Sequence, residues 1–156
     1  AKTRPMKPLM IVCTDFSPCS DVALERAADI AKRDETRVFI IHTYDPKRVK
    51  GPAALAPNER ERRGWDEESM RQLKGARHRY FGHLSDTDVQ YDAVPCASPS
   101  VEICRVAAET KASLIVLGSH GRTGMLRRLL GSVAEATVRH APCSVFVVRD
   151  PAAAPD

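Results

Sequence analysis

Short apolar segments alternate with helical stripes along the whole of this chain. Four segments are almost continuously apolar or aromatic, which is typical of strands buried on both faces of a sheet: 8–14, 37–44, 113–117 and 144–149. Residues 88–94 alternate between apolar and polar side chains, so they predict a further strand, nearer an edge of the sheet. Strands buried on both faces require a layer of helices on each side.

Helix signals lie between the predicted strands. Ser-Pro pairs at 17–18 and 98–99 each predict a helix start, because serine caps a helix well and proline suits the first helical position. Apolar spacing over 59–84 predicts a long amphipathic helix, although three glycines weaken it. Residues 132–140 predict a short helix, and the proline-rich residues 45–58 predict a loop.

This alternation predicts an α/β fold: a single open, parallel, five-stranded sheet with helices on both faces. In such sheets, ligands bind outside the carboxyl ends of the strands, where the strand order reverses. The segments to examine for a binding site are therefore Asp15 and Phe16, Thr43 and Tyr44, and residues 118–130.

Length, charge and cysteine content exclude several classes of function. At 156 residues the chain has a one-domain length, and no apolar run approaches the roughly 20 residues that cross a bilayer. The net charge of +4 is not gathered into a stripe with stacking aromatics, so no nucleic-acid partner is expected. Five cysteines, an odd number with no Cys-x-x-Cys pair, indicate a reducing compartment, and we expect the cytoplasm.

The segment from Gly118 to Ser132 carries the clearest chemical signal. It follows a predicted buried strand, contains several glycines and arginines, and ends at a predicted helix start, an arrangement that suits a phosphate. It is neither a Walker loop nor a dinucleotide-binding G-x-G-x-x-G. The residues alone leave a second interpretation open, in which the glycines only let the chain turn. In that case Ser132 only caps its helix, as the start of a capping box with Glu135.

The spacing Gly118-x2-Gly121-x9-Gly131-Ser132 resembles the G-x2-G-x9-G-[S/T] pattern of ATP-binding universal stress proteins. The flanks are similar to that family too, as are residues 11–17, which end in Thr-Asp-Phe-Ser. The resemblance covers residues 7–149 and leaves residues 150–156 as a tail that we expect to be disordered. It implies an adenine nucleotide alpha hydrolase-like fold with strand order 3-2-1-4-5.

The resemblance also implies a ligand and the residues that contact it. Adenosine is expected against Asp15 and the main chain near Thr43, with the ribose and phosphates wrapped by the glycine segment. The terminal phosphates, with Mg²⁺ or Mn²⁺, are expected at the start of the last helix. The implied nucleotide-binding residues are Cys13, Thr14, Asp15, Thr43, Leu117, Gly118, His120, Gly121, Arg122, Gly131, Ser132 and Val133.

These features predict an ATP-binding regulatory protein of the stress response rather than an enzyme. No carboxylate lies between 118 and 132 to act as a base, so we assign no catalytic residue and expect at most slow ATP hydrolysis. The family resemblance implies a homodimer through Val145 to Val148, and we expect a regulatory protein partner. The alternatives are a slow ATPase, a structural dimer that has lost nucleotide binding, and a redox or adenylating enzyme. The last would need a reactive thiol or a pyrophosphatase-type signature, and the sequence shows neither, although the reactivity of Cys19 and Cys96 can be measured.

Overall fold

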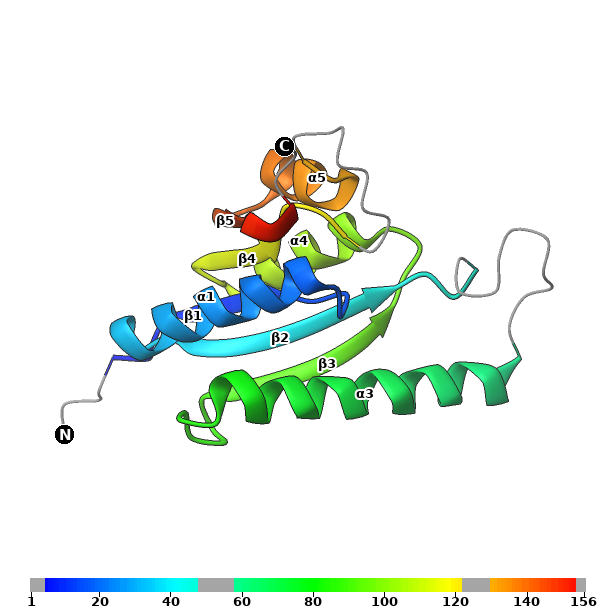
Figure 1. Cartoon of the computed structure of the whole chain (residues 1–156), viewed down its shortest axis with the longest axis horizontal. Helices are drawn as coiled ribbons and strands as arrows, with labels where there is room; N and C mark the ends of the chain where they lie inside the picture. Colours follow the sequence, from blue (N-terminus) through cyan, green and yellow to red (C-terminus); the bar gives the residue numbers. More distant parts are fainter. Residues whose placement is uncertain (1–4, 48–57, 122–129, 154–156) are drawn as a thin grey trace.

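One parallel five-stranded sheet of order β3-β2-β1-β4-β5 forms the centre of the molecule (Figure 1). The computed structural model describes residues 5–47, 58–121 and 130–153. The predicted fold class and strand order are confirmed, and every pair of neighbouring strands is parallel. The strands are β1 (Leu9–Cys13), β2 (Arg37–Tyr44), β3 (Val89–Pro95), β4 (Leu114–Gly118) and β5 (Ser144–Val148).

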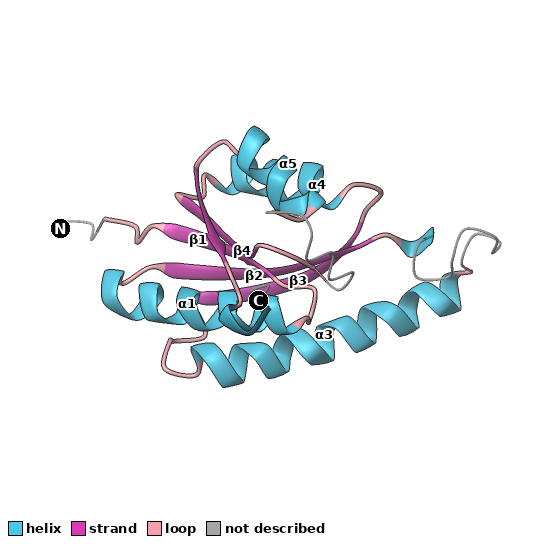
Figure 2. Ribbon diagram, turned by 45° about the horizontal axis from the view of Figure 1, so that its top comes forward, coloured by secondary structure: helices cyan, strands magenta, loops and turns pink. Residues whose placement is uncertain are grey.

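Helices cover both faces of this sheet. Figure 2 shows α1 and α3 on one face and α4 and α5 on the other. Among the residues that the structure describes, no helix combines the length and the apolar character needed to cross a bilayer. The helices are α1 (Pro18–Asp34), α3 (Glu59–Phe81), α4 (Pro99–Thr110) and α5 (Ser132–His140).

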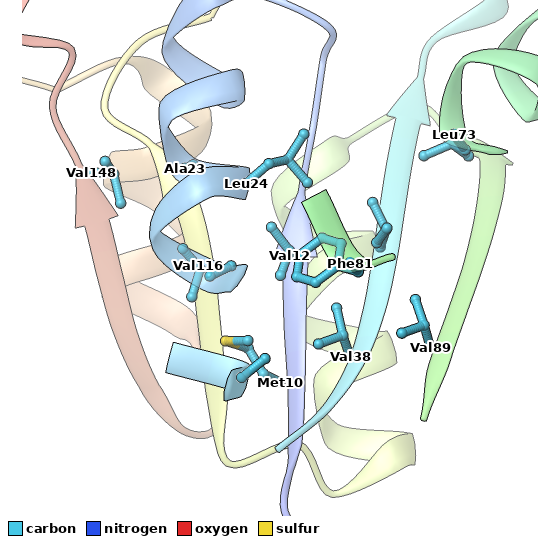
Figure 3. Packing of buried hydrophobic residues seen from close by; sticks show 13 residues of the cluster. Met10, Val12, Ala23, Leu24, Val38, Leu73, Phe81, Val89, Val116 and Val148 are labelled. Carbon is cyan, nitrogen blue, oxygen red and sulfur yellow. The ribbon is translucent and has the colours of Figure 1, made fainter. Parts of the chain in front are cut away.

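The central strand β1 is buried on both faces because its side chains alternate between two cores. Met10 and Val12 pack toward α1 and α3, and Figure 3 shows Val12 beside Leu24 and Phe81. Ile11 points to the opposite face and packs with residues of α4 and α5. Burying one such side chain stabilises the fold by about 1.5–3 kcal/mol, so the apolar pattern of the sequence accounts for the layers.

Side-chain caps fix the starts of α1 and α3. Ser17 is the N-cap of α1, and its hydroxyl accepts the N–H of Ser20, as the Ser-Pro signal predicts. Asn58 starts α3 in a full capping box with Glu61. Each such cap stabilises a helix by about 1 kcal/mol, which helps the long and mostly exposed α3 to form.

Helix α4 starts at the predicted Ser-Pro pair and α5 spans the predicted residues, but their caps differ from the sequence-based prediction. Ser98 is the N-cap of α4, but its side chain makes no cap hydrogen bond. The capping box predicted at Ser132 and Glu135 is wrong, because Gly131 is the N-cap of α5 and Ser132 is already its first helical residue. Both of these helices therefore begin without a side-chain acceptor for their first N–H groups.

The end of α3 and the C-terminal tail also differ from the sequence-based prediction. Helix α3 ends at Phe81 rather than at 84, because the buried Arg77 side chain donates to the carbonyls of Phe81 and Leu84 and closes the helix end. In the tail for which we expected disorder, Pro151–Ala153 form a 3-10 helix, and 154–156 lie outside the described residues.

The sheet order places a switch between β1 and β4. From β1 the chain continues outward through β2 to β3, whereas β4 lies on the other side of β1 and leads to β5. Parallel sheets bind their ligands at such a switch, outside the carboxyl ends of the two strands. The topology therefore directs attention to the loops that follow Cys13 and Gly118.

Candidate functional site

A pocket of about 260 Å³ lies at the carboxyl ends of β1, β2 and β4, at the switch in strand order. Its volume is near the lower limit of ordinary small-ligand sites, which span roughly 300–1,000 Å³. Of the predicted site residues, Arg122 lies outside the described residues, and the structure brings all the others to the wall of this pocket. They are Cys13, Thr14, Asp15, Thr43, Leu117, Gly118, His120, Gly121, Gly131, Ser132 and Val133.

Several residues that the sequence-based prediction did not include also line the pocket. Ser20 comes from the first turn of α1, Ser119 follows β4, and Ala134 lies in the first turn of α5. Pro99 and Ile103 come from the start of α4 and add an apolar wall. Pro99 and Ile103 reach the site because the strand order sets α4 beside β1 and β2, which no local motif encodes.

The loop after β1 holds Asp15 in a fixed orientation. Its Oδ1 accepts the N–H of Ser17 at 3.0 Å, a side-chain turn that aspartate forms readily. The N–H of Phe16 donates to the Thr14 hydroxyl at 3.0 Å, and Phe16 itself has a φ of 62°, in the left-handed region. Such a conformation costs a non-glycine residue about 1–3 kcal/mol, and it is frequent where a loop is shaped for a ligand.

Gly121 approaches the other carboxylate oxygen of the same aspartate. A Cβ at position 121 would lie 2.8 Å from Asp15 Oδ2. The carboxylate therefore occupies the space that any other side chain at position 121 would need. The loops after β1 and β4 meet at this point, as expected if both contact one ligand.

The two ends of the loop after β4 are joined by a main-chain hydrogen bond. The N–H of Ser119 donates to the Val148 carbonyl at 2.8 Å, and the N–H of Gly131 donates to the Ser119 carbonyl at 2.7 Å. A Cβ on Gly131 would come within 3.2 Å of that carbonyl and within 3.4 Å of His120 Cα. Glycine at 131 thus allows the close approach that sets the start of α5 beside the pocket.

The start of α5 faces the pocket with an electrostatic preference for an anion. Ser132, Val133 and Ala134 line the pocket, and no side-chain hydrogen bond caps this helix. A helix N-terminus carries free N–H groups and about half a positive charge. Glu135, whose carboxylate would oppose an anion, does not line the pocket and pairs with Arg139 at 3.3 Å instead.

The remaining polar groups of the wall are mostly hydroxyls. Thr14 Oγ1 and Ser20 Oγ are 3.1 Å apart, and Ser119 Oγ lies 3.0 Å from His120 Nδ1. Among the described residues that line the pocket, Asp15 is the only carboxylate, and within the described part of the chain no group of three or more His, Cys, Asp or Glu could hold a metal ion. The wall thus offers hydrogen bonds and a helix terminus rather than a metal cage.

Burial disfavours the thiolate form of two cysteines, Cys13 in the pocket wall and Cys96 after β3. Burial raises the pKa of the Cys13 thiol far above its usual range, and the neighbouring Cys104 raises it further. The pKa of Cys96, one of the two candidates for a reactive thiol, is also raised, mainly by burial and then by Glu102. Both groups are neutral thiols at physiological pH, and the nucleophile in cysteine chemistry is the thiolate.

Comparison with known proteins agrees with this geometry. A sequence model described as the universal stress protein family matches residues 9–149. The chain belongs to the universal stress protein family. The match begins at the first residue of β1 and ends just after β5, so it contains the whole sheet and the whole pocket.

Individual universal stress proteins are similar over nearly their full length. One from Methanocaldococcus jannaschii is 33% identical over 144 residues, which cover 91% of this chain and 82% of that protein. The structure of UspA from Lactobacillus plantarum superposes with a TM-score of 0.71 at 23% identity, over 94% of this chain and 100% of the other. A universal stress protein solved in complex with cAMP has a TM-score of 0.64 at 26% identity, over 90% of this chain and 95% of that one.

Proposed function

We propose that this universal stress protein binds an adenine nucleotide, ATP in particular, in the pocket between β1 and β4, and that occupancy regulates its interactions in the stress response. The observation that carries the proposal is the convergence of Asp15, Gly121 and the uncapped start of α5 on one pocket. The related protein that is solved with cAMP makes an adenine nucleotide the first ligand to test.

The pocket supplies suitable groups for a nucleoside. Asp15 offers a carboxylate that can accept hydrogen bonds from hydroxyl or amino groups. Cys13, Leu117 and Ile103 contribute apolar atoms beside it, and flat purine bases bind well between such groups. This combination of one acceptor and an apolar wall supports adenosine as the buried part of the ligand.

The phosphates are assigned to the start of α5. Gly131 keeps the main chain close, and the first-turn N–H groups provide donors for anionic oxygens. Ser132 lines the pocket in the same turn, and its hydroxyl can donate one more hydrogen bond. We include Arg122 as a further phosphate contact on the strength of the sequence motif alone.

A divalent cation is proposed to enter together with the phosphates. Mg²⁺ usually keeps several waters and is held by substrate phosphates with one or two protein oxygens, so the site needs no preformed cage. The hydroxyls and the single carboxylate of this wall fit such a role for Mg²⁺ or Mn²⁺. The ion would neutralise phosphate charge, while the residues of this chain bind and orient the nucleotide.

Binding without rapid turnover is the activity that the wall supports best. Fast phosphoryl transfer needs a positioned water, a base and several cations around the terminal phosphate. The only carboxylate that lines the described pocket is Asp15, whose Oδ1 already accepts the Ser17 N–H. We therefore propose a nucleotide-dependent regulator, with hydrolysis slow at most.

The proposal also includes a homodimer and a location in the cytoplasm. Strand β5 lies at an edge of the sheet, and Phe146 exposes 40% of its surface there, which supports a homodimer formed through β5. All five cysteines are free thiols, in keeping with the reducing cytoplasm. Nucleotide occupancy would then act on this dimer, or on a protein partner that recognises it.

Titration calorimetry with matched variants tests the site. The wild-type protein is titrated with ATP·Mg²⁺, with adenosine and with GTP·Mg²⁺, and we expect ATP to bind and GTP to bind much more weakly. Ser132→Ala should weaken ATP by about tenfold, the effect of one charge-assisted hydrogen bond, and leave adenosine nearly unchanged. Asp15→Asn should weaken both ligands. Equal affinity for ATP and GTP would contradict the adenine assignment, and loss of adenosine affinity in Ser132→Ala would contradict the phosphate assignment.

A further inference from the structure

Strand pairing between β1 and β2 stops just where the pocket begins. The last matched pair is Cys13 with Ile41, and the N–H of Thr14 donates to the Ile41 carbonyl at 3.0 Å. If parallel pairing continued, the carbonyl of Thr14 would accept the N–H of Thr43. The described register ends before that bond, so the Thr14 carbonyl finds another partner.

That partner is the side chain of His42. Its Nδ1 lies 2.8 Å from the Thr14 carbonyl oxygen. A carbonyl oxygen can only accept, so Nδ1 donates the hydrogen bond. Both the neutral ring with its proton on Nδ1 and the charged ring can make this bond. His42 thus adds one side-chain bond to a ladder of main-chain bonds, at the point where the ladder would otherwise continue to Thr43, a residue of the pocket wall.

Aromatic packing holds the His42 ring in place. The ring of Phe16 lies 4.4 Å from that of His42, and the ring of Tyr44 stacks against His42 at 5.9 Å. The Tyr44 hydroxyl in turn donates to Asp66 on α3. Phe16 is the residue with the left-handed φ in the loop after β1, so its contact with His42 stabilises a strained turn.

The His42 side chain acts on a loop that forms part of the pocket, although His42 itself does not line the pocket. Thr14 and Asp15 line the pocket, and Phe16, the next residue in the chain, packs its ring against the His42 ring at a tilt of 38°. The Asp15 carboxylate is already fixed relative to Ser17, so its position in the pocket depends on how the Thr14 peptide is held. The His42 bond acts on that peptide.

We propose that His42 is a positioning residue of the nucleotide site: by donating to the Thr14 carbonyl it sets the place of Asp15 and keeps the main chain of Thr43 out of the β1–β2 ladder, while Thr43 stays paired with Val94 of β3. This inference rests on the proposed nucleotide binding for its effect on affinity. Its effect on the loop itself is present in the nucleotide-free protein and can be measured separately.

Two variants separate the hydrogen bond from the ring. His42→Phe keeps an aromatic ring between Phe16 and Tyr44 and removes the donor. His42→Asn removes the ring and keeps an N–H donor at the position of Nδ1, since both nitrogens are bonded to the side-chain carbon after Cβ. With ATP·Mg²⁺ and with AMP as probes, we expect His42→Phe to lose about five- to tenfold in affinity, the effect of one buried hydrogen bond. His42→Asn should recover most of that loss.

A double-variant cycle then asks whether His42 acts through Asp15. In an Asp15→Asn background, adding His42→Phe should change ATP affinity much less than it does in the wild type, because coupled residues are not additive. A role confined to general stability would instead lower the melting temperature and leave the affinity losses multiplicative. Multiplicative losses, or equal affinities for His42→Phe and wild type, would overturn the proposal.

Amide hydrogen exchange covers the case in which the wild type binds neither probe. That result would contradict the proposed function and leave the positioning role of His42 to be tested separately. The Phe16 and Ser17 amides report on the loop without any ligand, because they donate to Thr14 Oγ1 and Asp15 Oδ1. We expect these two amides to exchange several-fold faster in His42→Phe than in wild type or His42→Asn. Unchanged exchange in His42→Phe would overturn the positioning role directly.

Discussion

Asp15 and Gly121 share one small volume: a Cβ at position 121 would lie 2.8 Å from Asp15 Oδ2. The two residues come from the loops after β1 and β4, which the sheet order sets side by side. A carboxylate at 15 in its observed orientation therefore requires glycine at 121. Since the clash would involve only the end of a side chain, a substitution at 121 should disturb the site more than the fold.

The first prediction is that Gly121→Ala separates binding from stability. The added methyl group should turn the Asp15 carboxylate away and break its bond with the Ser17 N–H. We expect ATP affinity to fall by about tenfold or more, with a change in the free energy of unfolding of about 1 kcal/mol or less. Calorimetric titration and chemical denaturation measure the two quantities.

The matched control for this variant is Gly75→Ala. Gly75 lies inside α3, and a Cβ there would meet nothing within 4 Å. Because alanine favours a helix over glycine, the control should gain about 0.5–1 kcal/mol in stability and keep its ATP affinity. If Gly121→Ala also binds like wild type, the loops after β1 and β4 do not form one site.

The second prediction concerns Gly118, whose constraint comes from packing. A Cβ on Gly118 would lie 2.9 Å from the sulfur of Cys19 and 3.2 Å from the main-chain carbonyl carbon and oxygen of that residue in α1. Because the main chain of a helix cannot move aside easily, Gly118→Ala should lower the free energy of unfolding by about 1–3 kcal/mol. Adding Cys19→Ala should recover only part of this loss, since the carbonyl contact remains. Full recovery of the free energy of unfolding would contradict the main-chain contact and leave the Cys19 thiol as the only cause of the loss.

The third prediction tests the proposed dimer. If β5 pairs with a second copy, a charge at Phe146 should prevent association, because it would be buried without a partner. We expect a dimeric wild type and a monomeric Phe146→Glu in light scattering after size exclusion. Val101→Glu is the control, since Val101 exposes 65% of its surface on α4, away from β5, and should leave the dimer intact. A monomeric wild type would contradict the assembly.

The fourth prediction is a pH dependence of stability at the edge of the sheet. A hydrogen bond from Lys7 at 2.7 Å lowers the pKa of the Asp88 carboxyl in the folded protein. A lowered folded pKa stabilises the protein above the unfolded pKa, and this contribution is lost as the pH falls through the folded value. Asp88→Asn should therefore lower the melting temperature at neutral pH and match wild type in strong acid. A difference that is constant with pH would contradict the ion pair as the cause.

The strand positions followed from the sequence because burial imposes their apolar patterns directly, whereas the strand order was implied by the family resemblance. The continuous apolar run of β1 leaves no exposed face, and Met10 and Ile11 are fully buried on opposite sides. The glycine spacing also predicted positions of the site correctly, since a Cβ would lie 2.8 Å from Asp15 Oδ2 at Gly121 and 3.2 Å from the Ser119 carbonyl oxygen at Gly131.

Other features depended on contacts between distant segments. The cap at Ser132 was predicted wrongly because Gly131 takes the N-cap position, held by its hydrogen bond to the Ser119 carbonyl. The contribution of Ile103 arises from the packing of α4 over β1 and β2, which no local pattern encodes. His42 lies inside the predicted strand 37–44, and its bond to Thr14 depends on the register of β1 and β2, which the sequence does not give.

The most direct test of the central claim is the identity of the small molecule that the protein carries. Freshly purified protein is denatured, and mass spectrometry identifies the small molecule that it releases. The emptied protein from the same preparation is then titrated with ATP·Mg²⁺. We expect an adenine nucleotide near one per chain, and ATP binding that Gly121→Ala weakens. Release of no nucleotide, with no ATP binding at millimolar concentrations, would contradict nucleotide binding as the function of this pocket.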